Sequence, residues 1–166
     1  RIVADIQELS QTMDAVIVTP HWGKEYESLP REEERAAARR MLDAGAVAVV
    51  GSHPHVLQPW EKYRAGDRDT FILHSLGNFV SNQRDVERRS SIVLYLELSK
   101  FGNAVKLTGA QYLPIHTAIA EDHHMYVEPA DKERDPEAWG HVVGTMGDSN
   151  RMGNFAQPPK FRSSCR

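Results

Sequence analysis

The sequence predicts a mixed α/β fold that opens with a parallel β-α-β unit and continues with antiparallel strands. Two short apolar runs, residues 15–19 and 46–50, are separated by a segment with helical character, as in parallel sheets. The second run is apolar at nearly every position, which indicates a strand covered on both faces. Residues 91–98 and 104–115 flank a Phe-Gly-Asn turn, which is typical of an antiparallel hairpin.

The first fifty residues are predicted to alternate helix and strand. Residues 2–13 carry apolar side chains at helical spacing and are expected to form the first helix. Pro30 opens a second helix, and the three glutamates in its first turn suit the helix dipole. Gly45 is expected to end this helix, because glycine adopts the left-handed conformation common just after a helix.

After these elements the sequence predicts antiparallel strands and then an irregular segment. Residues 58–64 and 70–73 are expected strands, with a Gly-Asp turn between them. From residue 121 the chain is polar, with scattered proline and glycine, so residues 121–166 are expected to be an irregular extension. The folded domain is therefore expected to comprise residues 1–120. Within the extension, we expect a tail beyond residue 145.

Length and composition indicate one ordinary globular domain. The chain has 166 residues, of which 40% are hydrophobic and 26% charged, and it can bury a core of its own. A net charge of −3 and the lack of a basic stripe argue against a nucleic-acid partner, and no apolar run could span a membrane. The single cysteine, Cys165, excludes an internal disulfide. The chain opens without methionine or an apolar leader, so we expect it to be a fragment of a longer protein.

Histidines follow both strands of the predicted parallel unit. His21 comes shortly after the first apolar run, and His53 and His55 follow the second across a proline that stiffens the link. Open α/β sheets place ligands at the carboxyl ends of their strands, and neighbouring loops come within reach there. Because imidazole is a common metal ligand, we expect a transition-metal or zinc site at these histidines. Loop histidines bonded to the backbone are the alternative.

Three further side chains are candidates around the histidines. Glu25 is expected to be a metal ligand, an acid–base group or a partner that orients a histidine, and a solvated carboxylate is equally open. Trp22 is expected to line the pocket or to join the core. Asn78 follows a strand and is expected to bind substrate or to form a turn. The sequence contains no phosphate-binding loop, dinucleotide fingerprint or nucleophile elbow, and the remaining five histidines show no useful arrangement.

Three ordered motifs lie in the first 80 residues. They read HWGKEY at 21–26, VVGSHPHVLQ at 49–58 and SLGNFV at 75–80. Over roughly residues 2–118 the chain resembles the bacterial capsule-synthesis CapA (poly-γ-glutamate capsule) family, which is similar to the calcineurin-like metallophosphoesterases. The resemblance implies an α/β/β/α sandwich of two mixed sheets, of which this chain would be the carboxyl-terminal half.

The resemblance also implies a site for two divalent metal ions, with Mn, Zn or Fe as the candidates. His21 and His53 would share one ion, and His55 would bind the other. The catalytic residues that it implies are His21 and Glu25. The side chains that it implies for substrate contact are Trp22, Gln58 and Asn78.

This chain departs from the phosphoesterase pattern at its start. That pattern begins with Asp-x-His, Gly-Asp and Gly-Asn-His motifs, and nothing before His21 matches them. We therefore expect an incomplete site in this chain, with or without a bound metal. The expected partners are an anionic polymer or phosphoester substrate, and the missing amino-terminal half or a second copy of the chain.

Two functions follow from the resemblance. The first is metal-dependent hydrolysis in capsule or envelope polymer metabolism, with the parent protein at the cell envelope outside the cytoplasm. The second is a non-catalytic component that binds or anchors the polymer. Whether the chain is an enzyme stays open at this point, because a shared fold does not fix a reaction.

Overall fold

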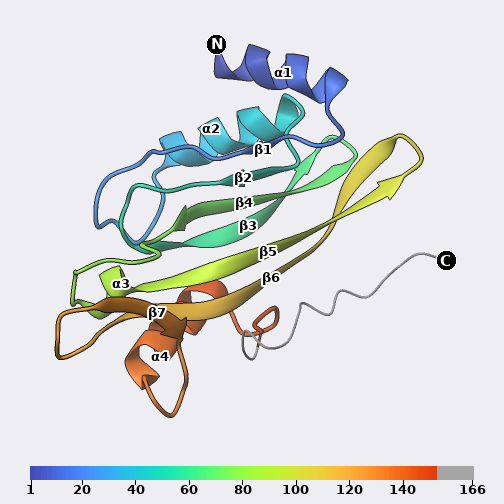
Figure 1. The fold of residues 1–166 in the computed structure, drawn as a ribbon. Helices are drawn as coiled ribbons and strands as arrows, with labels where there is room; N and C mark the ends of the chain where they lie inside the picture. The colour runs from blue at the N-terminus through green and yellow to red at the C-terminus, as the bar shows by residue number, and fades with distance from the viewer. Residues whose placement is uncertain (153–166) are drawn as a thin grey trace.

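The computed structural model describes residues 1–152 of the chain. Helices α1 (Ile2–Thr12) and α2 (Glu32–Asp43) lie on one side of a four-stranded sheet, and a three-stranded sheet lies on the other side (Figure 1). This arrangement confirms the predicted mixed α/β class. Within the described residues, no helix is long and apolar enough to cross a membrane.

The four-stranded sheet has the order β1-β2-β4-β3 and combines both strand directions. Strand β2 pairs in parallel with β1 and with β4, whereas β3 pairs antiparallel to β4. The parallel start and the antiparallel continuation were both expected from the sequence. The bounds of the four strands are β1 (Ile17–Val18), β2 (Ala48–Val50), β3 (Leu57–Ala65) and β4 (Arg68–Leu76).

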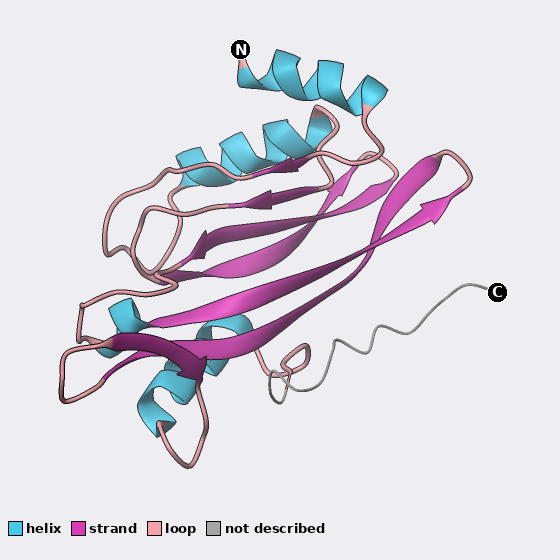
Figure 2. Cartoon of the chain, in the orientation of Figure 1, coloured by secondary structure: helices cyan, strands magenta, loops and turns pink. Residues whose placement is uncertain are grey.

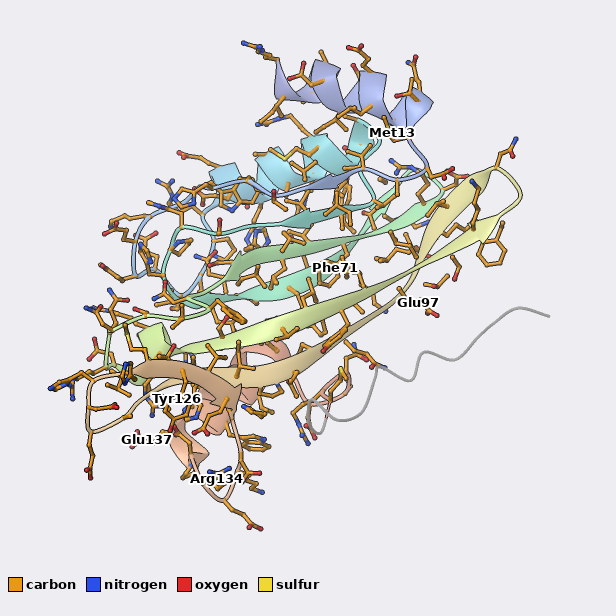
Figure 3. The ribbon with its side chains drawn as sticks, in the orientation of Figure 1. Met13, Phe71, Glu97, Tyr126, Arg134 and Glu137 are labelled. Atoms are coloured by element: carbon orange, nitrogen blue, oxygen red, sulfur yellow. The ribbon has the colours of Figure 1, made fainter. Side chains whose placement is uncertain are left out.

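This sheet is buried on both faces, as the continuous apolar run of β2 predicts. Val49 and Ile72 belong to the core cluster formed with α1 and α2. Ala48 and Leu73, one residue along each strand, belong to a second cluster with residues of the three-stranded sheet. Phe71 of β4 lies in this second cluster, between the sheets (Figure 3). Successive side chains of a strand point to opposite faces, so one strand serves two cores.

The second sheet is antiparallel and has the order β5-β6-β7. Strand β5 (Ser90–Phe101) and strand β6 (Ala104–Ile119) form the hairpin expected from the sequence, with Gly102 at a φ of 61° in the turn. The short helix α3 (Val86–Arg89) leads into β5, and β7 (Met125–Pro129) pairs with β6. Figure 2 shows the long, twisted hairpin extending past the first sheet.

The expectation of an irregular extension from residue 121 is wrong for two elements. One is β7, and the other is α4 (Pro136–Met146), whose Val142 and Met146 are buried in the core between the sheets. Apolar residues are sparse in this region, but those of α4 fall on one helix face, so a few contacts suffice to hold it. Met152 also bonds to β6, and the remaining part of the expected tail, residues 153–166, lies outside the described residues.

Candidate functional site

The loops that follow β1 and β2 continue the pairing of these two strands. His21 and Ser52 form an isolated parallel bridge, in which the Trp22 N–H donates to the Ser52 carbonyl at 3.0 Å. The Ser52 N–H donates to the Pro20 carbonyl, also at 3.0 Å. Strands β2 and β4 end at the same edge of the sheet (Figure 2). The continued pairing therefore brings the two histidine-bearing loops together at the edge that the sequence predicts.

His21 and His53 contact one another directly. The Nδ1 atom of His53 lies 2.9 Å from Nε2 of His21, with the rings nearly edge to face. The Ser52 hydroxyl lies 3.5 Å from the Pro20 carbonyl, which can only accept, and 3.3 Å from Nδ1 of His21. The Ser52 hydroxyl therefore donates its proton to the Pro20 carbonyl and accepts one from Nδ1 of His21. If both rings are neutral, Nε2 of His21 then accepts from Nδ1 of His53. The lone pair of His53 is then on Nε2.

His55 is oriented by Asn78. The Nδ2 group of Asn78 donates to the carbonyls of His55 and Arg88 and to Oε1 of Gln83. These three acceptors fix the amide, so its Oδ1 faces Nδ1 of His55 at 2.8 Å and accepts its proton. The lone pair of His55 is therefore on Nε2, which lies 3.9 Å from Oε1 of Glu25.

The backbone of the site is strained. Among residues 1–152, four non-glycine residues have a positive φ, and three of them lie here: Tyr26 at 66°, His53 at 109° and His55 at 61°. Such conformations cost about 1–3 kcal/mol each and persist only where the surroundings hold them. One restraint is the hydrogen bond from the Tyr26 N–H to the Pro54 carbonyl, at 2.7 Å. Strain of this kind clusters at functional sites.

Trp22 and Gly51 pack the histidine loops closely against strand β4. The Trp22 Nε1–H donates to the His74 carbonyl at 3.0 Å, and its ring packs against the core cluster of α1 and α2. A Cβ on Gly51 would lie 2.0 Å from that same carbonyl oxygen, so only glycine fits. Trp22 is thus partly buried against the core, and its expected role in lining a pocket stays a prediction.

His74 lies behind the site and is only 1% exposed. Its Nε2 is 3.2 Å from Oε1 of Glu61. Burial lowers the pKa of His74 and so favours its neutral imidazole. The nearby Glu61 carboxylate opposes this effect but does not outweigh it. His74 stands in a strand with polar and apolar neighbours alike, so no local pattern indicates that it is buried.

Gln58 is buried and holds the first loop in place. Its Nε2 donates to the Glu27 carbonyl at 2.8 Å, so the strand β3 is tied to the loop that carries His21 and Glu25. The structure thus brings six of the seven expected side chains to one edge of the sheet or directly onto its loops. The seventh is Trp22, whose partly buried ring packs against the core cluster of α1 and α2.

Two further residues at the site received no role from the sequence. The ring centroid of Tyr26 is 5.9 Å from that of His55, and the guanidinium carbon of Arg88 is 4.1 Å from the Tyr26 centroid. Tyr26 stands in the first motif, next to Glu25, so its position carried a usable signal. Arg88 lies beyond all three motifs, and no spacing pattern connects it to the histidines.

The donor atoms do not form a ready metal cage. Within the part of the chain that the structure describes, no group of three or more His, Cys, Asp or Glu side chains is arranged to hold a metal ion. Instead the donors fall into two sets, His21 with His53 and His55 with Glu25. The expected roles of these residues as metal ligands and catalytic groups stay predictions.

A family model described as bacterial capsule synthesis protein PGA_cap matches residues 1–83, half of the chain. The chain belongs to this family. The match includes every histidine of the site and Asn78. It ends before residue 118, to which the motif resemblance was expected to extend.

Curated relatives agree with this assignment. The chain is 44% identical over 97 residues to the PGA biosynthesis protein CapA of Bacillus subtilis, and 41% identical over 92 residues to the capsule biosynthesis protein CapA of Bacillus anthracis. These alignments cover 58% and 55% of this chain, but only 24% and 21% of the relatives. An uncharacterized protein of Sinorhizobium fredii, y4sH, is 37% identical over 84 residues, 47% of this chain and 16% of its own length. The chain therefore spans about a quarter or less of the length of these relatives.

Proposed function

We propose that this chain forms one wall of a metal-dependent hydrolytic site that acts on an anionic capsule polymer, poly-γ-glutamate or a related chain, at the cell envelope. The observation that carries this proposal is the convergence of three imidazoles and one carboxylate at the carboxyl edge of the parallel strands. The family assignment and the two CapA relatives support the link to capsule polymer.

The donor chemistry fits a divalent transition metal, because imidazole and carboxylate are its usual ligands. Two nitrogens bound to one tetrahedral zinc stand about 3.4 Å apart, since each bond is about 2.1 Å long. Nε2 of His21 and Nδ1 of His53 are 2.9 Å apart, so small ring rotations, with the proton of His53 moved to its Nε2, bring two lone pairs to that spacing. The Mn, Zn or Fe ion of the proposal would be held by His21 and His53, with His55 and Glu25 as the second donor set.

When bound, such a metal supplies Lewis-acid catalysis of hydrolysis. The side chains of this chain supply orientation and proton transfer. Ser52 fixes the ring of His21 and Asn78 fixes the ring of His55, in the way that neighbours of metal-binding histidines commonly do. Glu25, half-exposed and 3.9 Å from His55, is placed to take a proton from a water on its Oε1.

A second function is favoured by one observation. His21 and His53 hydrogen-bond to one another directly, so this pair of nitrogens is engaged without a metal. In that state the same edge would bind an anionic polymer through its imidazole and arginine side chains and would not hydrolyse it. This non-catalytic role is the alternative that the experiment must separate from the first.

Metal uptake separates the two functions. The full chain is equilibrated with zinc chloride, freed of excess ion and analysed by elemental mass spectrometry, beside His53→Ala and His124→Ala. His124 is an exposed histidine paired with Asp122 between β6 and β7, and serves as the matched control. We expect about one zinc per chain in the wild type and in the control, and a loss of most of it in His53→Ala. No uptake by the wild type, or equal uptake by all three proteins, would favour the non-catalytic function.

A further inference from the structure

A cationic side chain lies beside the histidines and belongs to no motif. Arg88 is the third residue of α3 and places its guanidinium carbon over the ring of Tyr26, 4.1 Å from the centroid. The same ring lies against His55, at a centroid distance of 5.9 Å. Tyr26 therefore contacts an imidazole of the site and the guanidinium at once.

Arg88 is tied to the site through its backbone as well. Asn78, which orients His55, donates to the Arg88 carbonyl and to Oε1 of Gln83, both at 2.9 Å. Gln83 donates in turn to the Tyr26 hydroxyl at 3.4 Å. A single amide thus couples the position of His55 to the segment that carries the arginine.

The guanidinium is accessible and keeps donors for a ligand. The side chain of Arg88 is 36% exposed and that of His55 is 39% exposed, so both are open to a ligand. A guanidinium has five N–H donors, and the ion pair with Asp85 engages Nη1 at 3.2 Å. Its planar fork matches the two oxygens of a carboxylate.

We propose that Arg88, oriented by Tyr26, binds a carboxylate side group of an acidic polymer beside His55. This inference rests on the proposed function and adds the side chain that recognises the carboxylates of the polymer. Tyr26 acts as a positioning residue, because its ring holds the guanidinium by a cation–π contact. The ring of Tyr26 contacts both His55 and Arg88, on a backbone with a φ of 66°.

Fluorescence anisotropy with a labelled γ-linked hexaglutamate tests the proposal on the full chain at low salt, without added metal. Arg88→Gln is expected to weaken binding about ten-fold, because a charged hydrogen-bond donor is lost. Arg88→Lys keeps the charge but loses the fork and should weaken binding about three-fold. Tyr26→Leu should weaken binding and make Arg88→Gln less damaging, whereas Tyr26→Phe keeps the ring and should bind as the wild type does.

Arg64→Gln is the matched control. Arg64 of β3 also forms an exposed ion pair, with Asp69 at 2.8 Å, but it lies beside the start of β4, at the opposite end of this strand pair from Leu76, so binding should change less than about two-fold. Equal affinity of wild type and Arg88→Gln would overturn the proposal, as would binding of inorganic phosphate but not of hexaglutamate. Both results leave the metal-uptake test unaffected. Conversely, the chain could bind hexaglutamate in a way that depends on Arg88 and yet take up no zinc. That result would support this proposal and reject metal-dependent hydrolysis.

Discussion

The histidines at the strand ends and His116 in the second sheet have very different surroundings. His53 and His55 are half-buried, lie on strained backbone, and face other imidazoles, an amide and a distant carboxylate. His116 is 6% exposed and lies between two carboxylates, with Nδ1 2.6 Å from Asp135 and Nε2 3.0 Å from Glu128. The first group has donor atoms to spare, whereas both nitrogens of the second are occupied.

Arg89 completes the second group, which we call the ionic cluster: Arg89, His116, Glu128 and Asp135. Arg89 bonds to both carboxylate oxygens of Asp135 with one guanidinium. The cluster joins the end of α3, strands β6 and β7, and the residue before α4. The comparison shows how the same side chain serves binding where its partners are incomplete and folding where they are complete.

The largest effect is expected from breaking the ionic cluster. Asp135→Asn should lower the free energy of unfolding at pH 7 by about 3 kcal/mol, because Arg89 and His116 lose their shared counter-charge in a mostly buried place. Asparagine still caps α4, since its side-chain oxygen can accept from the Ala138 N–H as Asp135 does. Urea denaturation measures the change.

Asp69→Asn is the control for this prediction. It breaks the exposed pair of Arg64 and Asp69, and the expected loss is below about 0.5 kcal/mol. If Asp135→Asn and Asp69→Asn were equally stable, the ionic cluster would not be a structural element and the contrast with the strand-end histidines would fail.

The same carboxylate gives a smaller, pH-dependent effect. Burial alone would raise the pKa of Asp135, but the hydrogen bonds from Arg89 and Ala138 and the charges of Arg89 and His116 outweigh it and hold the pKa at about 2. A carboxyl whose pKa is lowered on folding stabilises the protein above its ordinary pKa of 3.8, and this contribution is lost as the pH falls toward 2. It amounts to about 2 kcal/mol, on the scale of 1.36 kcal/mol per pKa unit.

Asp135→Asn removes this contribution and should flatten the pH dependence in that window. Urea midpoints of wild type and variant, measured from pH 5 to pH 2, should converge as the pH falls. A constant difference between them across this range would mean that Asp135 does not titrate with the cluster.

The sequence predicts the strand-end site better than the ionic cluster, and the reason is locality. His21, His53 and His55 follow apolar runs that read as parallel strands, so the position of the strands alone brings them to one edge. The ionic cluster joins residues 46 positions apart, such as Arg89 and Asp135, on elements whose packing no local pattern reveals. His116 therefore showed no useful arrangement in the sequence.

The misjudged carboxyl-terminal region has the same cause. Helix α4 has an N-cap aspartate followed by proline, which is a good local start signal, yet its surroundings are polar. Its place is set by Val142 and Met146 meeting residues of both sheets, contacts that depend on the whole fold. Strand β7 likewise depends on pairing with β6, because it has no buried residue of its own.

The smallest predicted effect tests the strain at the strand-end site. At ordinary backbone positions glycine is less stable than alanine by about 0.5–1 kcal/mol. At His53, with a φ of 109°, the order should invert, because glycine adopts this conformation freely and alanine does not. We expect the free energy of unfolding of His53→Gly to be about 1 kcal/mol higher than that of His53→Ala. The pair His124→Gly and His124→Ala, at an exposed histidine without a positive φ, should keep the ordinary order. If His53→Ala were the more stable of its pair, the loop would hold no strain, and the site would differ from the ionic cluster in its charges alone.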